Sequence, residues 1–295
     1  MYKKLILFSS ILILTGNHLT AQIDEFRNSW QQTVDSTNAN FFKAQYLNIS
    51  KEQLFELFDN LPSFEMFRDN YFTTGVPTNK AIDKNTADIK FQISVIQRLT
   101  KSILPLNTSL MLSYTQKSFW NAYENSSPFS DNNYNPGLML MRPILYNNHL
   151  KGIGTLAFEH ESNGLDSIKS RSWNYLTVSG VYFFNASFSV QAKLWAGKLG
   201  SENMDLYKYK GYGLLAINYR DLRDRFGCSL ILNPNSNLSS INTQFELNFR
   251  PSKKANQYLF LQWYNGYAEG LLEYNKYSSM LRVGICIKPP IRSLY

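Results

Sequence analysis

The sequence has 295 residues, enough for one large domain or two small ones, with 30 Lys and Arg against 22 Asp and Glu. The net charge of +8 is spread along the chain without a run of basic residues, which argues against a nucleic-acid-binding protein. The cysteines and histidines lack the spacing of a zinc site, and no apolar stretch is long enough for a transmembrane helix.

The first residues have the pattern of a secretory signal peptide. Lys3 and Lys4 form a short basic start, and the apolar run LILFSSILIL that follows is too short to cross a bilayer as a helix. The small residue Ala21 then marks an expected cleavage site. We therefore predict that Met1–Ala21 is removed and that the mature chain is exported to an oxidising compartment, where its two cysteines could form a disulfide.

Residues 22–87 lack the regular alternation of the rest of the chain. Within them, SKEQLFELFDN has a serine and a glutamine at capping-box spacing, Ser50 and Gln53, followed by apolar residues on one helical face. We interpret residues 22–87 as an N-terminal periplasmic extension of loops and short helices. It would pack at the periplasmic end of the following domain or partly inside it.

From Ile89 onward, apolar and polar residues alternate with the period of a β-strand. In INTQFELNF, for example, Phe245 and Leu247 lie on the opposite face from Gln244 and Glu246. About twelve strands are expected, over residues 89–97, 109–120, 137–146, 152–162, 172–182, 187–197, 209–219, 226–232, 241–249, 257–267, 269–275 and 281–288.

This alternation has two interpretations. In a soluble β-sandwich the apolar face forms the core, whereas in a membrane barrel it meets lipid and the polar face lines the interior. The signal peptide, the strands of about ten residues, the 15% aromatic content and the aromatic Tyr295 near the end favour the barrel. We predict an all-β fold, a transmembrane antiparallel β-barrel of about twelve strands over residues 88–295.

The same alternation places the two cysteines on opposite faces of the barrel wall. Cys228 shares the outward face with Leu230, and Cys286 shares the inward face with Arg282. Because thiols on opposite faces cannot meet disulfide geometry, both are predicted to be free.

The segment FEHESNGLDSIKSRSWNYL contains a set of residues suited to ester hydrolysis. His160 and Ser162 fall on the apolar face of the strand at 152–162, and a loop over 163–171 returns Asn174 beside His160. A serine nucleophile, a histidine base and an orienting amide form a recognised catalytic arrangement. The alternative is an ordinary group of polar residues at a strand end. We interpret the other histidine of the mature chain, His149, as a turn residue.

These motifs resemble outer-membrane phospholipase A, an integral outer-membrane lipase of Gram-negative bacteria. The resemblance is carried by H-x-S-N-G at 160–164 and SRSWN at 170–174, and by SYTQKSFW, SSPFSDNNYNP, KYKGYG and YNGYAEGLLEYN. It implies a twelve-stranded barrel with an outward-facing active site. It also implies calcium-dependent hydrolysis of sn-1 and sn-2 acyl esters of phospholipids and lysophospholipids in the outer leaflet, activated by homodimerisation.

The resemblance also assigns roles to individual residues. His160, Ser162 and Asn174 match the catalytic triad. The residues that match the calcium site are the Ser126 hydroxyl of the partner subunit, the Leu165 carbonyl, where the family has an arginine, Ser170 and the Glu202 carboxylate, where it has an aspartate. Gln116 matches a polar residue of the lipid-facing dimer surface. Two other functions stay open: a porin or structural barrel without catalysis, and a soluble β-sandwich binding module.

Overall fold

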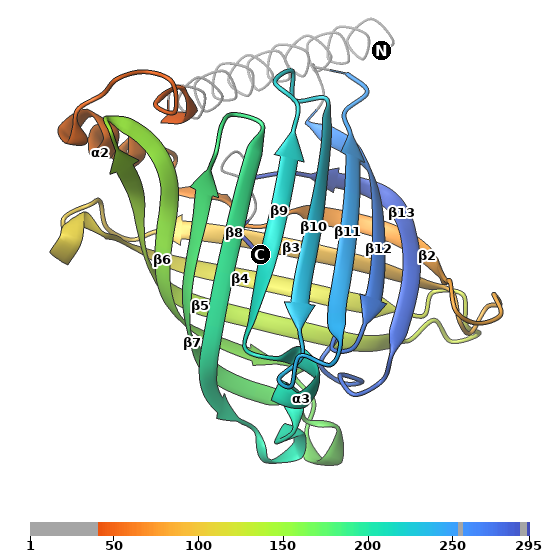
Figure 1. Ribbon diagram of the computed structural model, residues 1–295. Coiled ribbons are helices and arrows are strands. Elements are labelled where there is room, and N and C mark those ends of the chain that lie inside the picture. The colour runs from red at the N-terminus through yellow and green to blue at the C-terminus, as the bar shows by residue number, and fades with distance from the viewer. Residues whose placement is uncertain (1–40, 253–255, 290–293) are drawn as a thin grey trace, which may run out of the picture.

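The computed structural model is a closed antiparallel β-barrel (Figure 1), and it describes residues 41–252, 256–289 and 294–295. Strands β2 to β13 each pair with their neighbours, and the pairing of β13 with β2 closes the barrel. The twelve-stranded barrel expected from the sequence is thereby confirmed. The expected signal peptide lies outside the described residues.

The barrel is built from strands of unequal length that alternate with loops. The strands are β1 (Phe64–Met66), β2 (Asn70–Pro77), β3 (Asp88–Arg98), β4 (Ser109–Trp120), β5 (Phe129–Tyr146), β6 (His149–Ser162), β7 (Ser172–Phe183), β8 (Phe188–Leu199), β9 (Gly213–Arg220), β10 (Phe226–Pro234), β11 (Ile241–Phe249), β12 (Gln257–Gly266) and β13 (Ser278–Ile287). The helices are α2 (Lys51–Asp59) and α3 (Leu206–Lys210), with short 3-10 turns η1 (Pro105–Asn107), η2 (Ser167–Lys169) and η3 (Ser201–Asn203).

The barrel begins earlier than residue 88, so the boundary predicted for the N-terminal extension is wrong. Strand β2 lies within the predicted extension and pairs on both sides, with Phe72 opposite Phe91 of β3 and Ile285 of β13. The short β1 adds three residues to the same edge of β3. Gly75 allows β2 to approach β13, because a Cβ there would lie 2.2 Å from Arg282 Cγ.

Other predicted boundaries also need correction. Residues 269–275 are not a strand: they belong to the loop between β12 and β13, which buries Leu271 and Tyr274 in the barrel mouth. Residues 206–210 form α3, so β9 begins only at Gly213, and β5 begins at Phe129 rather than at 137. Tyr295 lies beyond the last strand and bonds to Gln191 of the interior wall.

The predicted division between inward and outward faces is confirmed. On β11, Glu246 is buried whereas Ile241 and Phe249 are exposed. The two cysteines are free, with Cys286 buried beside inward-facing aromatic rings and Cys228 on the other face.

Helix α2 closes one end of the barrel, called here the α2 end. Both hydrogen bonds of the predicted capping box between Ser50 and Gln53 are present. Leu54 and Phe58 then pack into an apolar cluster with inward-facing residues of β4 to β7. Within the described part of the chain, no helix is long and apolar enough to cross a membrane.

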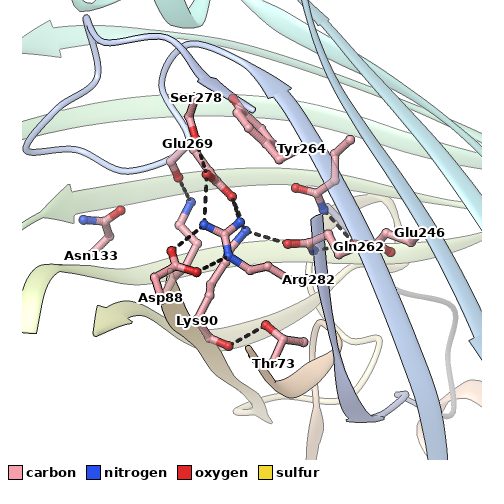
Figure 2. Close-up of polar contacts among 12 residues, drawn as sticks. Thr73, Asp88, Lys90, Asn133, Glu246, Gln262, Tyr264, Glu269, Ser278 and Arg282 are labelled. Atoms are coloured by element: carbon pink, nitrogen blue, oxygen red, sulfur yellow. Dashed lines mark hydrogen bonds and ion pairs between the residues drawn. The ribbon is translucent and has the colours of Figure 1, made fainter. Parts of the chain in front are cut away.

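Charged side chains bond to one another across the interior (Figure 2). Arg282 of β13 binds Asp88 of β3 and Glu269 of the β12–β13 loop, with Nη1 2.6 Å from Glu269 Oε1. Lys90 of β3 donates to Glu269 at 2.9 Å and to Gln262 of β12 at 2.7 Å. These bonds join β3 to β13 and β12 on the inner face of the barrel, past the intervening β2.

Candidate active site

The last residues of β6 alternate between two environments, as the sequence predicted. Phe158 and Leu156 are exposed on the outer surface, and His160 and Ser162 follow them on the same face. Glu159 lies between them and points into the barrel. The histidine and the serine therefore lie on the outer surface, in line with apolar side chains.

Strand β7 brings Asn174 directly opposite His160. The two residues are partners in the β6–β7 register, and His160 Nδ1 lies 2.9 Å from Asn174 Oδ1. With the amide oxygen as acceptor, Nδ1 carries the proton and Nε2 is left as an acceptor. Leu176 and Val178 share this outward face and are 58% and 61% exposed. The expected contact between His160 and Asn174 is therefore present.

Ser162 lies in a row of polar residues across the outer surface. Gln116 of β4 pairs with Tyr134 of β5, which pairs with Ser162 of β6. Among the described residues, no hydrogen bond joins the Ser162 hydroxyl to His160. The two side chains are nevertheless two residues apart on one strand face. Catalytic hydrogen bonds often form only once substrate is bound.

The other histidine considered in the sequence, His149, lies at the α2 end. Its Nδ1 contacts the Asn147 carbonyl oxygen at 2.6 Å in the β5–β6 turn. His149 is the first residue of β6, directly after the turn, and pairs with Tyr146, so it is a strand residue rather than the expected turn residue.

Inward-facing residues that were not predicted from the sequence support His160 and Asn174 from inside the barrel. Asn135 of β5 donates to the His160 carbonyl oxygen at 2.9 Å and to the Tyr175 hydroxyl at 3.0 Å. Trp173 Nε1 donates to Glu161 Oε2 at 2.9 Å. In the sequence, only the alternation of polar and apolar residues along β5 and β6 indicated that these side chains face inward.

The β6–β7 loop is folded around the buried side chain of Asn163. Its Oδ1 accepts from the backbone N–H groups of Arg171 at 2.9 Å and Leu165 at 3.3 Å, and its Nδ2 donates to the Lys169 carbonyl oxygen at 2.8 Å. Leu165 is exposed and Ser170 is half-buried on this loop. One buried amide thus sets the shape of the segment that carries two expected calcium ligands.

Glu202 lies on η3, which is attached to the start of β7. The Gly200 N–H donates to the Ser172 carbonyl oxygen at 2.7 Å, and the Asn203 Oδ1 accepts from the Ser172 N–H at 3.1 Å. A hydrogen bond from the Ser201 hydroxyl lowers the pKa of the exposed Glu202 carboxyl. Glu202 is therefore an ionised carboxylate near the β6–β7 loop at neutral pH.

Ser126 is exposed in the β4–β5 loop at the same end of the barrel. The described residues contain no group of three or more His, Cys, Asp and Glu that could hold a metal ion. A cation at this end would instead depend on a mixed set of oxygen donors: hydroxyls, a carbonyl and one carboxylate. Calcium prefers such hard oxygen ligands.

Comparison with known proteins agrees with this geometry. The family model of phospholipase A1 matches residues 58–287. Phospholipase A1 of Escherichia coli K12 is 34% identical over 207 residues, 68% of this chain and 69% of that protein. Phospholipase A1 of Proteus vulgaris is 30% identical over 218 residues, 71% of this chain and 72% of that protein.

This chain belongs to the phospholipase A1 family.

Solved structures of phospholipase A1 family members share the fold. Outer membrane phospholipase A from Escherichia coli aligns with a TM-score of 0.67 and 28% identity, over 76% of this chain and 93% of that chain. The Salmonella typhi outer membrane phospholipase, a dimer with bound calcium, aligns with the same TM-score and identity over 76% of this chain and 91% of that one. A further Escherichia coli structure is an active-site mutant with asparagine replaced by alanine.

Membership of the phospholipase A1 family settles two of the alternatives. The chain is a phospholipase, an enzyme that hydrolyses carboxylic esters, and not a soluble β-sandwich module. Its location is the outer membrane of a Gram-negative bacterium. The exposed leucine, valine and phenylalanine side chains of the outer surface accordingly face lipid.

Proposed function

We propose that this phospholipase hydrolyses acyl esters with a Ser162–His160–Asn174 triad on its lipid-facing surface. The observation that carries the proposal is the 2.9 Å contact between His160 Nδ1 and Asn174 Oδ1, with Ser162 on the same strand face. The asparagine-to-alanine active-site mutant of the Escherichia coli relative also supports an asparagine in this role.

In the proposed mechanism, His160 Nε2 accepts the Ser162 hydroxyl proton as the serine oxygen attacks the acyl carbonyl carbon. The imidazolium then returns this proton to the leaving alcohol, and an activated water later releases the fatty acid. Asn174 holds the ring through Nδ1. Because a neutral amide stabilises imidazolium less than a carboxylate does, the oxyanion needs other positive charge nearby.

The substrates follow from the position of the site. A serine on the outer face, in line with Phe158 and Leu156, is reached by lipids that diffuse in the bilayer. The site lies at the end of the barrel opposite α2 (Figure 1). If that end faces outward and the α2 segment is periplasmic, as we propose, the substrates are phospholipids and lysophospholipids of the outer leaflet. Both sn-1 and sn-2 esters would be cleaved.

We further propose that activity requires calcium. The Leu165 carbonyl, the Ser170 hydroxyl and the Glu202 carboxylate would hold the ion, because the β6–β7 loop and η3 are both attached to the start of β7. Bound calcium would supply the positive charge that the neutral triad lacks. The bound calcium of the Salmonella typhi relative supports this assignment.

The active form is proposed to be a homodimer. Ser126 lies in a different loop from the other three ligands, and it would complete the calcium site of the partner subunit. Gln116 would lie in the lipid-facing contact between subunits. One subunit provides fewer oxygen ligands than the six to eight that calcium takes, so the dimer should bind the ion more tightly. By linkage, calcium should then strengthen the dimer.

The test is phospholipid hydrolysis by the detergent-purified protein, with its association state measured by sedimentation. We expect activity to be lost in excess chelator and restored by calcium. Ser126→Ala should shift half-activation to higher calcium, whereas Ser130→Ala, close by at the start of β5, should not. Full activity in chelator from a species that sediments as a monomer would contradict both the calcium and the dimer proposals.

A further inference from the structure

A cavity of about 180 Å³ lies inside the barrel, directly behind the strands that carry the proposed triad. Its wall includes Glu161 of β6 and Trp173 and Tyr175 of β7. These residues alternate along the strands with His160, Ser162 and Asn174, which point the other way. The cavity is therefore separated from the lipid-facing site by the barrel wall alone.

Basic side chains outnumber acidic ones around this cavity. The charged residues that line it are Arg68, Lys117, Lys193, Lys210, Glu161 and Glu269. Their ion-pair network adds Glu159, Lys90, Arg282 and Asp88. Together these are six cations and four carboxylates. The neighbouring Lys288, Asp69 and Glu246, which the same hydrogen-bond network joins through Gln244 and Gln262, make seven cations and six carboxylates, an excess of one positive charge.

In the described part of the chain, Lys117 is the cation of this network that lacks a carboxylate partner. Its ammonium group donates to the backbone carbonyl oxygen of Glu269 at 2.5 Å, and it forms no ion pair with a carboxylate among the described residues. Lys90 and Lys210 lie close enough to repel it, and Glu161 and Glu269 attract it from beyond ion-pair distance. Among the described residues, no carboxylate oxygen therefore lies within ion-pair distance of this ammonium group.

Arg68 and Lys193 share the single carboxylate of Glu159. Lys193 Nζ lies 2.9 Å from Glu159 Oε1, whereas Arg68 Nη2 is 3.6 Å from Oε2 of the same carboxylate. The Nε of Arg68 is buried and, within the described chain, has no hydrogen-bond partner. A single carboxylate therefore serves two cations, and one donor stays unused.

A further cavity lies beside this one, toward the loop end of the barrel. This second cavity, of about 370 Å³, is lined by residues of the loops after β2, β4 and β12, and Glu269 lines both cavities. A lipid headgroup would have to bring its acyl chains into this polar interior. The ligand chemistry that fits is therefore a free inorganic anion.

We propose that the cavity behind the catalytic strands binds a small inorganic anion, a halide or an oxyanion such as phosphate, through Lys117 and Arg68. An incompletely paired charge in the half-buried interior is costly, and an anion between these cations would neutralise the excess positive charge. The volume of the cavity accommodates such an ion with its remaining waters.

The test uses crystals of the full detergent-purified protein grown with bromide and, separately, with phosphate. Bromide should give an anomalous peak within hydrogen-bond distance of Lys117 Nζ, and phosphate should give tetrahedral density there. Lys117→Gln should lose the ion and Lys117→Arg should keep it. Lys101→Gln, which removes an exposed lysine from the β3–β4 turn, should also keep it.

A solution measurement separates real affinity from occupancy at crystal concentrations. When bromide replaces gluconate at constant ionic strength, the unfolding temperature of wild type should rise, and that of Lys117→Gln should not. If Lys117→Gln does not fold, Arg68→Gln should show the same loss. A wild-type cavity without anion density, or a peak that persists in Lys117→Gln, would overturn the proposal.

Discussion

Successive residues of β6 have different tasks because their side chains face different environments. His160 and Ser162 face lipid, while Glu159 and Glu161 accept hydrogen bonds from Tyr175 and Trp173 inside the barrel. A side chain on the outer surface of a strand has few protein neighbours that could fix its position. In this barrel, the inward-facing neighbours fix the backbone from which it projects.

The contact between His160 and Asn174 predicts unequal effects of substitution. His160→Ala removes the proposed base and should lower kcat by roughly 10²–10⁴-fold. Asn174→Ala should cost less, because it removes only the orientation of the ring. Phospholipid hydrolysis at saturating calcium measures both. Asn185→Ala, in a turn at the α2 end, serves as the control and should retain wild-type kcat. Equal losses for the two site variants would contradict an orienting role for Asn174.

The β6–β7 loop depends on one side chain for its conformation. The buried Asn163 bonds three backbone groups of this loop, among them the N–H of Leu165, whose carbonyl is a proposed calcium ligand. Because Asn163 shapes the loop without contacting substrate, its loss should weaken calcium binding more than it lowers the rate of ester hydrolysis at saturating calcium.

Asn163→Ala tests this dependence. The variant should raise the calcium concentration for half-activation and lower the unfolding free energy by about 1–3 kcal/mol, since three backbone groups lose their partner. Asn185→Ala is again the matched control, because its Oδ1 accepts two turn N–H groups at 2.8 Å far from the site. Calcium titration of activity and urea unfolding are the measurements. An unchanged calcium requirement in Asn163→Ala would refute the role of this loop.

The sequence predicted most strands of the barrel because lipid on one side and polar groups on the other impose a strict alternation. It failed where this alternation is interrupted. Strand β2 ends in Gly75, Val76 and Pro77, a composition typical of loops, although its pairing is complete. The loop after β12 gave the opposite error, because Leu271 is apolar to fill the barrel mouth and not to face lipid.

The part of the candidate site that depends on residue spacing within β6, β7 and their loop was predicted from the sequence. Strand parity and loop length placed Asn174 beside His160. They gave no sign of Asn135 or Asn163, because the contacts of these two amides depend on the register of neighbouring strands and on the path of a loop. Such contacts are fixed only when the barrel closes.

At the scale of the whole molecule, charged residues inside the barrel join strands that are distant in sequence. Glu269 accepts from both Lys90 and Arg282, which lie on the first and last parts of the barrel. Removing its charge would leave two buried cations with only Asp88 to balance them. The stability of the closed barrel should therefore depend on this one carboxylate.

Glu269→Gln should lower the unfolding free energy by about 3–5 kcal/mol, the usual cost of removing one partner of a buried ion pair. Glu273→Gln is the control on the same loop. Its side chain is 63% exposed and pairs with Lys276 at the surface, so it should cost less than about 1 kcal/mol. Urea unfolding in lipid vesicles compares the two variants. Equal losses would show that the interior pairs do not stabilise the barrel.

The central claim is that Ser162 is the nucleophile of a lipid-facing active site. The most direct measurement treats the detergent-purified enzyme with a serine-directed sulfonyl fluoride in calcium and maps the modified residue by mass spectrometry of its peptides. We predict modification of Ser162 with parallel loss of phospholipid hydrolysis, and neither labelling nor hydrolysis in Ser162→Ala. A label on any other residue with the same loss of activity, or wild-type turnover by Ser162→Ala, would contradict the account.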